Sequence, residues 1–182
     1  MHELSLHVLD LVENSTGAGA DRVTVTVEED PLRDEMRICI EDNGRGMDSA
    51  MVSRIRDPFV TTRTTRKVGL GLSLMDMTTR MCDGNLRIES ALGVGTTVDA
   101  TWRLSHLDRP PLGNMAATLK TILVMNPGII FRYCHTVGER SFTLDSGEIR
   151  LALGDLPLTQ PEVLEWLDGY LKENLSILYG GK

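Results

Sequence analysis

The sequence predicts an α+β protein, a two-layer α/β sandwich that carries a small C-terminal α+β extension. Two patterns support this fold class, because apolar residues recur at helical spacing in some segments and at every second position in others. The length supports it as well, since 182 residues suffice for one good core, or for one domain with a sizeable appendage. Two full domains are not expected.

The first segment predicts a helix over residues 3–15, followed by two adjacent strands. Gly17 and Gly19 end the helix, and alternating apolar residues mark the strands at residues 23–27 and 36–40. The predicted buried stripe of the helix is Leu4, Val8, Leu11, Val12 and Ser15. The opposite face of the helix carries Glu3, His7, Asp10 and Asn14.

The next segment predicts a short helix, a loop, a longer helix and two more strands, which complete a first unit ending near Leu104. Asp48 is a natural N-cap for the short helix through Ile55. Residues 57–67 are rich in threonine and arginine without an apolar period, which predicts a mobile loop. Gly84 ends the longer helix, and the strands are expected near residues 86–89 and 96–104. The predicted buried face of the longer helix is Leu70, Leu74, Met77 and Met81.

Adjacent prolines mark a boundary after this first unit, because Pro110 and Pro111 force extended backbone. We therefore divide the chain into a unit over residues 1–104, a linker over 105–113 and an extension over 114–182. The extension is expected to hold a helix over 115–125, two short strands around 129–136 and 140–144, and a terminal helix.

The terminal helix is marked by its start and by one apolar stripe. Pro161 suits its first turn, and Thr159 with Glu162 matches the sequence pattern of a capping box. The stripe consists of Val163, Leu164, Leu167, Leu171, Leu175 and Leu178. Packing of this stripe on the first unit is favoured, while a homodimer or a partner surface stays open.

The composition restricts the ligands and the location. A formal net charge of -7 and a pI near 5.1 disfavour nucleic acid as a partner, so the ligand should be small or proteinaceous. The three cysteines are widely spaced and predict neither a disulfide framework nor a zinc site. No apolar stretch is long enough to span a bilayer, and the N-terminus lacks the cationic start of a signal peptide. We therefore expect a cytoplasmic protein without a membrane contact.

The polar run from Asp42 to Met47 is the most informative chemical feature, because it directly follows the strand over residues 36–40. Its two glycines, Gly44 and Gly46, allow the backbone close to a ligand beside the Asp42 carboxylate. Asp-Asn-Gly is also a common turn sequence, so this run alone would indicate a plain turn and a ligand site equally well. Polar segments at residues 10–15, 57–62 and 69–73 flank it, and the four segments in this order predict a nucleotide site.

Asp10 and Asn14 are four residues apart, so both side chains leave the same face of the first helix. A carboxylate and a carboxamide offer oxygen atoms to a hard cation such as Mg²⁺. A solvated polar face is the competing interpretation of the same helix.

Gly69 and Gly71 stand where the longer helix begins, so backbone N–H groups and the positive helix end could face a phosphate. A tight entry from loop to helix would use the same glycines. The cations Arg63, Arg66 and Lys67 come just before them, where they would neutralise a polyphosphate.

In this order, the motifs over residues 3–104 resemble those of the GHKL or Bergerat-fold ATPases, which include gyrase, Hsp90, sensor histidine kinases and mismatch-repair ATPases. The resemblance implies the histidine-kinase-like ATPase fold, with ATP and Mg²⁺ as ligands. It matches Asn14 to a magnesium-binding Asn and Asp10 to the general-base Glu of the hydrolases. It matches Asp42 to the residue that binds the adenine amino group, and Thr96 or Thr97 to a threonine near the adenine.

The full set of positions implied by the resemblance covers the nucleotide and the metal. The implied nucleotide-binding residues are Asn14, Asp42, Gly44, Gly46, Met47, Phe59, Thr61, Thr62, Lys67, Gly69, Leu70, Gly71, Leu72, Thr96 and Thr97. The implied metal ligands are Asn14 and Asp10, and Asp10 is also the implied catalytic residue.

Two departures leave the branch of the superfamily open. Residues 57–74 look like sensor histidine kinases, whereas residues 11–20 look more like the mismatch-repair ATPases. Sensor kinases typically carry Asn at the position of Asp10, so a carboxylate there keeps water activation open, or it sits on the metal side. Lys67 stands where the kinase glycine box usually has its first glycine, so closure of the loop over the nucleotide should differ.

Three functions follow from these motifs. The leading hypothesis is an ATP- and Mg²⁺-binding protein that is either a slow ATPase or a kinase acting on a separate protein. His2 and Glu3 superficially resemble a phospho-acceptor box, but chance is the better account, and no acid follows His106 or His135. Autophosphorylation in the usual manner is therefore not expected. The alternative is a non-catalytic, ATP-dependent switch that engages a protein partner through residues 114–182.

Overall fold

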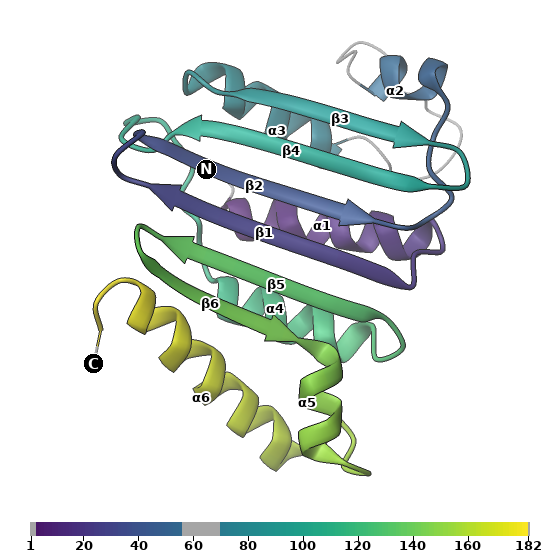
Figure 1. Ribbon diagram of the computed structural model, residues 1–182, viewed down its shortest axis with the longest axis vertical. Helices are drawn as coiled ribbons and strands as arrows, with labels where there is room; N and C mark the ends of the chain where they lie inside the picture. Colours follow the sequence, from purple (N-terminus) through teal and green to yellow (C-terminus); the bar gives the residue numbers. More distant parts are fainter. Residues whose placement is uncertain (1–2, 56–69, 182) are drawn as a thin grey trace.

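A single six-stranded sheet organises the part of the chain that the computed structural model describes, residues 3–55 and 70–181. The strand order is β3-β4-β2-β1-β5-β6, and α3, α1 and α4 lie behind the sheet in Figure 1. The strands are β1 (Arg22–Asp30), β2 (Glu35–Asp42), β3 (Asn85–Ala91), β4 (Gly95–Arg103), β5 (Ile130–Val137) and β6 (Arg140–Asp145). The helices are α1 (Leu4–Gly17), α2 (Ser49–Ile55), α3 (Leu70–Met81), α4 (Met115–Met125), α5 (Ser146–Leu153) and α6 (Pro161–Leu178). The predicted α+β sandwich is thereby confirmed.

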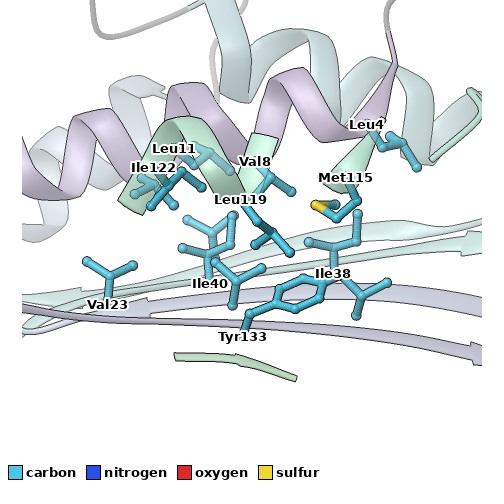
Figure 2. Close-up of a cluster of buried hydrophobic side chains, with 14 of the residues drawn as sticks. Leu4, Val8, Leu11, Val23, Ile38, Ile40, Met115, Leu119, Ile122 and Tyr133 are labelled. Carbon is cyan, nitrogen blue, oxygen red and sulfur yellow. The ribbon is translucent and has the colours of Figure 1, made fainter. Parts of the chain in front are cut away.

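The core lies between the sheet and the helix layer. Every second residue of β1 and β2 faces the helices, because side chains alternate across a strand, and Val25 and Ile38 are almost fully buried there. Figure 2 shows Leu4, Val8 and Leu11 of α1 meeting the sheet together with α4 residues such as Leu119. The helix that carries Asp10 and Asn14 is therefore fixed to the sheet along its whole length.

The start of α1 is tied to the segment that precedes α4. The backbone N–H groups of Leu4 and Ser5 donate to the carbonyl groups of Pro111 and Leu112, at 2.9 and 2.8 Å. The first N–H groups of a helix have no partner within the helix, so these carbonyl groups satisfy two of them. The Glu3 carboxylate in turn accepts a hydrogen bond from the backbone of residue 114. The segment over residues 105–113 thus holds the N-terminus of α1.

The C-terminal segment continues the same sheet. β5 pairs in parallel with β1, and β6 pairs antiparallel with β5 at the edge. The helices of this segment pack on what came before, since α4 contacts α1, and α6 contacts α4 and β6. The division into units at residues 105–113 stays a prediction.

A partly buried polar network fastens the end of α6 to β1. His135 is fully buried. Its Nδ1 atom lies 2.9 Å from the Tyr133 hydroxyl oxygen, and its Nε2 atom lies 3.3 Å from Glu29 Oε1. The Tyr179 hydroxyl also donates to Glu29 Oε1. Burial raises the pKa of Glu29, but hydrogen bonds from His135 and Tyr179 outweigh it and leave the pKa of Glu29 below its ordinary value.

Most predicted elements are confirmed, and Asp48 caps α2 as expected, because its Oδ1 accepts from the backbone N–H of Met51 at 2.7 Å. The apolar stripe of α6 is buried within the chain, against α4 and β6 rather than against the first unit. No helix in residues 3–55 and 70–181 is long and apolar enough to cross a membrane.

Three details of the prediction are wrong. The buried face of α3 contains Leu72, Met75 and Thr79, while Met77 and Met81 are at least half exposed. Thr79 can be buried because its hydroxyl donates to the carbonyl group of Asp76 within the helix. Gln160 precedes α6 without a side-chain cap, so Thr159 makes no capping box. Helix α5 was not expected at all, although Asp145 caps it.

Candidate functional site

Three polar side chains line up across neighbouring strands at one end of the sheet. Ser90 of β3 is paired with Thr96 of β4, and Thr96 is paired with Asp42 of β2. Residues paired in register share a face of the sheet, and these three continue the rows of residues that face the helices. The apolar rows of the core therefore end in a polar row beside α1.

The Asp42 carboxylate is held by three donors. Its Oδ2 accepts from the Ser15 hydroxyl at 2.7 Å, and its Oδ1 accepts from the backbone N–H groups of Gly44 and Thr96 at 2.9 and 3.3 Å. Such bonds from α1, the loop and β4 fix the carboxylate in one orientation. We use the name Asp42 corner for the group formed by Ser15, Asp42, Gly44, Ser90 and Thr96.

Two glycines are required by the close approach of backbone around this corner. Gly46 has φ +65°, and a Cβ there would lie 1.9 Å from the carbonyl oxygen of Ala91. Gly95 has φ +133°, and a Cβ there would lie 1.9 Å from the carbonyl oxygen of Asp42. A side chain at Gly46 would push the loop away from the end of β3, and a side chain at Gly95 would push the start of β4 away from the end of β2.

Asn43 shows why the run after β2 forms a fixed loop. Its side-chain oxygen accepts from the backbone N–H groups of Asp21 and Arg22, at 3.1 and 2.9 Å, and its amide donates to the Asp21 carboxylate at 2.6 Å. The turn predicted by Asp-Asn-Gly is thus present next to Asp42, the residue predicted to bind a ligand. The turn holds the carboxylate in place.

Asp10 and Asn14 lie on the side of α1 next to α3. Among the described residues, neither side chain has a hydrogen-bond or ion-pair partner, and Asp10 is exposed. A Cβ on Gly71 would lie 3.4 Å from both Cβ and Oδ2 of Asp10, so the first turn of α3 passes directly beside this carboxylate. The glycine therefore keeps the space next to Asp10 open.

Asp10 and Asn14, the predicted metal ligands, are too few to hold a metal ion by themselves. The described residues contain no group of three or more His, Cys, Asp or Glu side chains that could hold a metal ion. Mg²⁺ requires six oxygen ligands and keeps several of them as water or phosphate. Two side chains would leave most of these positions to water or phosphate.

The other predicted site residues divide into three groups. Leu72 is buried in the core, and Met47 is partly buried and packs against the core. Thr97 lines a hollow on the opposite, open face of the sheet, which leaves Thr96 as the threonine at the Asp42 corner. Leu70 begins α3, and Phe59, Thr61, Thr62, Lys67 and Gly69 lie outside the described residues.

Ser90 is a site residue that the sequence reasoning missed. Its hydroxyl accepts from the backbone N–H of Met47 at 2.8 Å and lies 2.9 Å from both the Gly95 carbonyl oxygen and the Thr96 hydroxyl. A serine in a strand carries no signal by itself. Its place opposite Thr96, across the turn that leads into Gly95, could have indicated it.

Comparison with known proteins gives this geometry a family context. The family model described as "Histidine kinase-, DNA gyrase B-, and HSP90-like ATPase" matches residues 2–106. The sensor protein kinase FleS of Pseudomonas aeruginosa is 39% identical over 105 residues, which are 58% of this chain and 25% of FleS. The non-motile and phage-resistance protein of Caulobacter vibrioides is 34% identical over 97 residues, 50% of this chain and 12% of that protein. The chain thus spans a quarter or less of the length of these relatives.

A solved structure resembles the whole chain in fold. The N-terminal domain of a DNA repair protein matches with a TM-score of 0.53 and 15% identity, covering 98% of this chain and 57% of that one. The match extends over the C-terminal segment, which the family model leaves out.

Proposed function

We propose, from the premise that this chain belongs to the histidine kinase-, DNA gyrase B- and HSP90-like ATPase family, that it binds ATP together with Mg²⁺. The observation that carries this proposal is the Asp42 corner, where three donors orient one carboxylate beside α1. The same helix carries Asp10 and Asn14, whose side chains have no partner within residues 3–55 and 70–181. Asp42 would accept a hydrogen bond from the adenine amino group.

The phosphates would lie between α1 and the first turn of α3. Asn14 and Asp10 would hold the Mg²⁺ ion, which neutralises phosphate charge when bound. Gly71 supports this placement, because it leaves the space beside Asp10 free of a side chain. Five predicted residues that precede α3 in the sequence would complete the site: Phe59, Thr61, Thr62, Lys67 and Gly69.

For the bound ATP we propose slow hydrolysis or phosphotransfer to a separate protein. In hydrolysis, Asp10 accepts a proton from water while the water oxygen bonds to the terminal phosphorus and the bond to the ADP oxygen breaks. In phosphotransfer, a hydroxyl group of the partner replaces the water and gives its proton to Asp10. A switch that binds ATP without turnover would use the same contacts except this proton transfer.

The partner and the setting are also proposals. Residues 114–182 would contact a protein partner through their outer surface, where Trp166 and Ile177 are about half exposed at 46% and 47%. A cytoplasmic location fits a protein that draws on the ATP pool. A homodimer remains a prediction, and nucleic acid is not proposed as a ligand because of the net charge of -7.

The experiment that tests the function follows terminally labelled ATP with Mg²⁺. Free phosphate identifies a hydrolase, and label retained on a second protein identifies a kinase. Bound ATP without turnover identifies a switch. Asp10→Asn should lower turnover about a hundredfold or more while ATP still binds. Asp155→Asn serves as the control, because this exposed aspartate follows α5 and its side chain has no partner in the described part of the chain. Unchanged turnover in Asp10→Asn would exclude Asp10 as the base.

A further inference from the structure

The Ser90 hydroxyl makes three short contacts, and together they determine where its hydrogen atom lies. A serine hydroxyl offers one donor hydrogen and two acceptor lone pairs. The Met47 N–H at 2.8 Å can only donate to Ser90, and the Gly95 carbonyl oxygen at 2.9 Å can only accept from it. Ser90 therefore gives its hydrogen to Gly95.

The third contact then has only one direction. The Thr96 hydroxyl lies 2.9 Å from the Ser90 hydroxyl. Since the hydrogen of Ser90 is already used, Thr96 must donate to Ser90 for all three contacts to be hydrogen bonds. The Thr96 hydroxyl has then spent its own hydrogen, and only its lone pairs face away from Ser90.

The same arithmetic applies to Asp42. A carboxylate only accepts hydrogen bonds and has about four lone-pair sites, of which Ser15, Gly44 and Thr96 occupy three. The remaining site lies on Oδ2, beside α1. At the side-chain level, the Asp42 corner therefore offers acceptors and no free donor hydrogen to a ligand.

We propose that Ser90 is a positioning residue that sets base specificity: it turns the Thr96 hydroxyl into an acceptor, so the corner takes a base with an amino group. This inference rests on the proposed ATP binding. Adenine carries an amino group with two N–H donors at carbon 6. Hypoxanthine and guanine carry a carbonyl oxygen there, which would face lone pairs without a hydrogen between them. Ser90 acts through Thr96 and does not touch the base.

ATP and inosine triphosphate are the probes, because inosine triphosphate replaces the amino group by a carbonyl oxygen and keeps the sugar and phosphates. With the full-length protein and Mg²⁺, calorimetry should show ATP binding about tenfold or more tighter than inosine triphosphate. In Ser90→Ala the Thr96 hydroxyl is free to rotate and donate. The ratio of the two affinities should then narrow by about threefold to tenfold.

A double-mutant cycle separates this role from a loss of structure. Thr96→Val removes the hydroxyl, so adding Ser90→Ala to Thr96→Val should leave the affinity ratio unchanged. Ser90→Thr keeps a hydroxyl group and should retain the wild-type ratio. Ser141→Ala, at an exposed serine of β6, is the matched control. Thermal unfolding without nucleotide records any general loss of stability.

The outcomes distinguish this inference from the proposed function. If the wild-type protein binds neither nucleotide, the proposed function fails and the inference falls with it. If ATP binds but Ser90→Ala keeps the wild-type ratio of the two affinities, only the inference is overturned. The same holds if Ser90→Ala narrows that ratio as much in the Thr96→Val background as in the wild-type protein. A narrowed ratio that depends on Thr96 supports it.

Discussion

The two ends of the sheet use polar side chains in opposite ways. At the Asp42 corner, polar groups are oriented by hydrogen bonds and keep unused acceptor sites, as Asp42 and Thr96 do. In the C-terminal segment, His135, Tyr133 and Tyr179 spend their polar atoms on one another and on Glu29. The first arrangement leaves acceptor sites unused, and the second fastens the chain.

The C-terminal segment, in which no catalytic motif is recognised, has a structural role. Residues 111 and 112 cap α1, and α4 packs against the same helix. The helix with Asp10 and Asn14 is thus held in part by residues that the family model does not include. The following changes test the roles assigned to the two ends of the sheet, beginning with the largest expected effect.

Leu119→Ala should produce the largest loss. Leu119 of α4 is fully buried beside α1, so its truncation leaves a cavity and should cost about 2–5 kcal/mol of the free energy of unfolding. Denaturant titration measures the loss, and Leu151→Ala, at an exposed leucine of α5, should change it by less than about 0.5 kcal/mol. Since α1 also loses support, ATP affinity should fall only in Leu119→Ala. An unchanged affinity would show that the segment does not support the site.

Gly46→Ala should have the next largest effect. Its Cβ would meet the Ala91 carbonyl oxygen, and its positive φ adds strain, so we expect a loss of more than about 1 kcal/mol in stability. Gly93→Ala is the matched control, because Gly93 also has a positive φ, of +74°, but nothing lies within 4 Å of its Cβ position. Calorimetry should find weaker ATP binding in Gly46→Ala alone. If both variants lost the same amount of stability, the positive φ would explain the loss and the contact with the Ala91 carbonyl oxygen would not.

Tyr179→Phe should cost about 1 kcal/mol at neutral pH, because one hydrogen bond to Glu29 is lost. The folded state lowers the pKa of Glu29, so this stability is present above the ordinary pKa of 4.5 and is lost as pH falls through the lower, folded value. Tyr179→Phe should therefore reduce the dependence of unfolding temperature on pH in that acidic range. A steeper dependence would contradict the network.

The smallest effect concerns two cysteines that flank Thr26 on the open face of the sheet, Cys39 on β2 and Cys134 on β5. Burial, followed by the charges of Asp99 and Glu41, raises the pKa of Cys39 to about 11. Only the thiolate reacts, so at pH 8 a thiol reagent should label Cys134 about tenfold faster than Cys39. Peptide mapping by mass spectrometry measures both rates, and faster labelling of Cys39 would show that β2 opens readily.

The sequence predicted the elements well wherever side-chain periodicity and capping residues agreed. The helix over residues 115–125 coincides with α4, and the predicted carboxylate, Asp42, stands at the end of β2. Periodicity failed for α3, because methionines that fit an apolar stripe are exposed while Thr79 is buried with its hydroxyl satisfied inside the helix. Local hydrogen bonding had overridden polarity there.

The remaining features depend on contacts that are distant in sequence. Ser15 and Ser90 reach the Asp42 corner from α1 and β3, and nothing in their local sequence shows it. The parallel pairing of β5 with β1 joins residues more than a hundred positions apart, which a boundary at two prolines does not reveal. Strand order is set by packing of the whole chain.

The central claim is that the oriented Asp42 carboxylate binds the base of ATP. Asp42→Asn keeps the size of the side chain but replaces one acceptor oxygen by an N–H₂ group, and calorimetry with ATP and Mg²⁺ would compare it with wild type and with Asp155→Asn. We expect Asp42→Asn to bind ATP about a hundredfold more weakly than the wild-type protein, and Asp155→Asn to bind it as tightly as the wild-type protein does. Equal ATP affinity in all three proteins would contradict it.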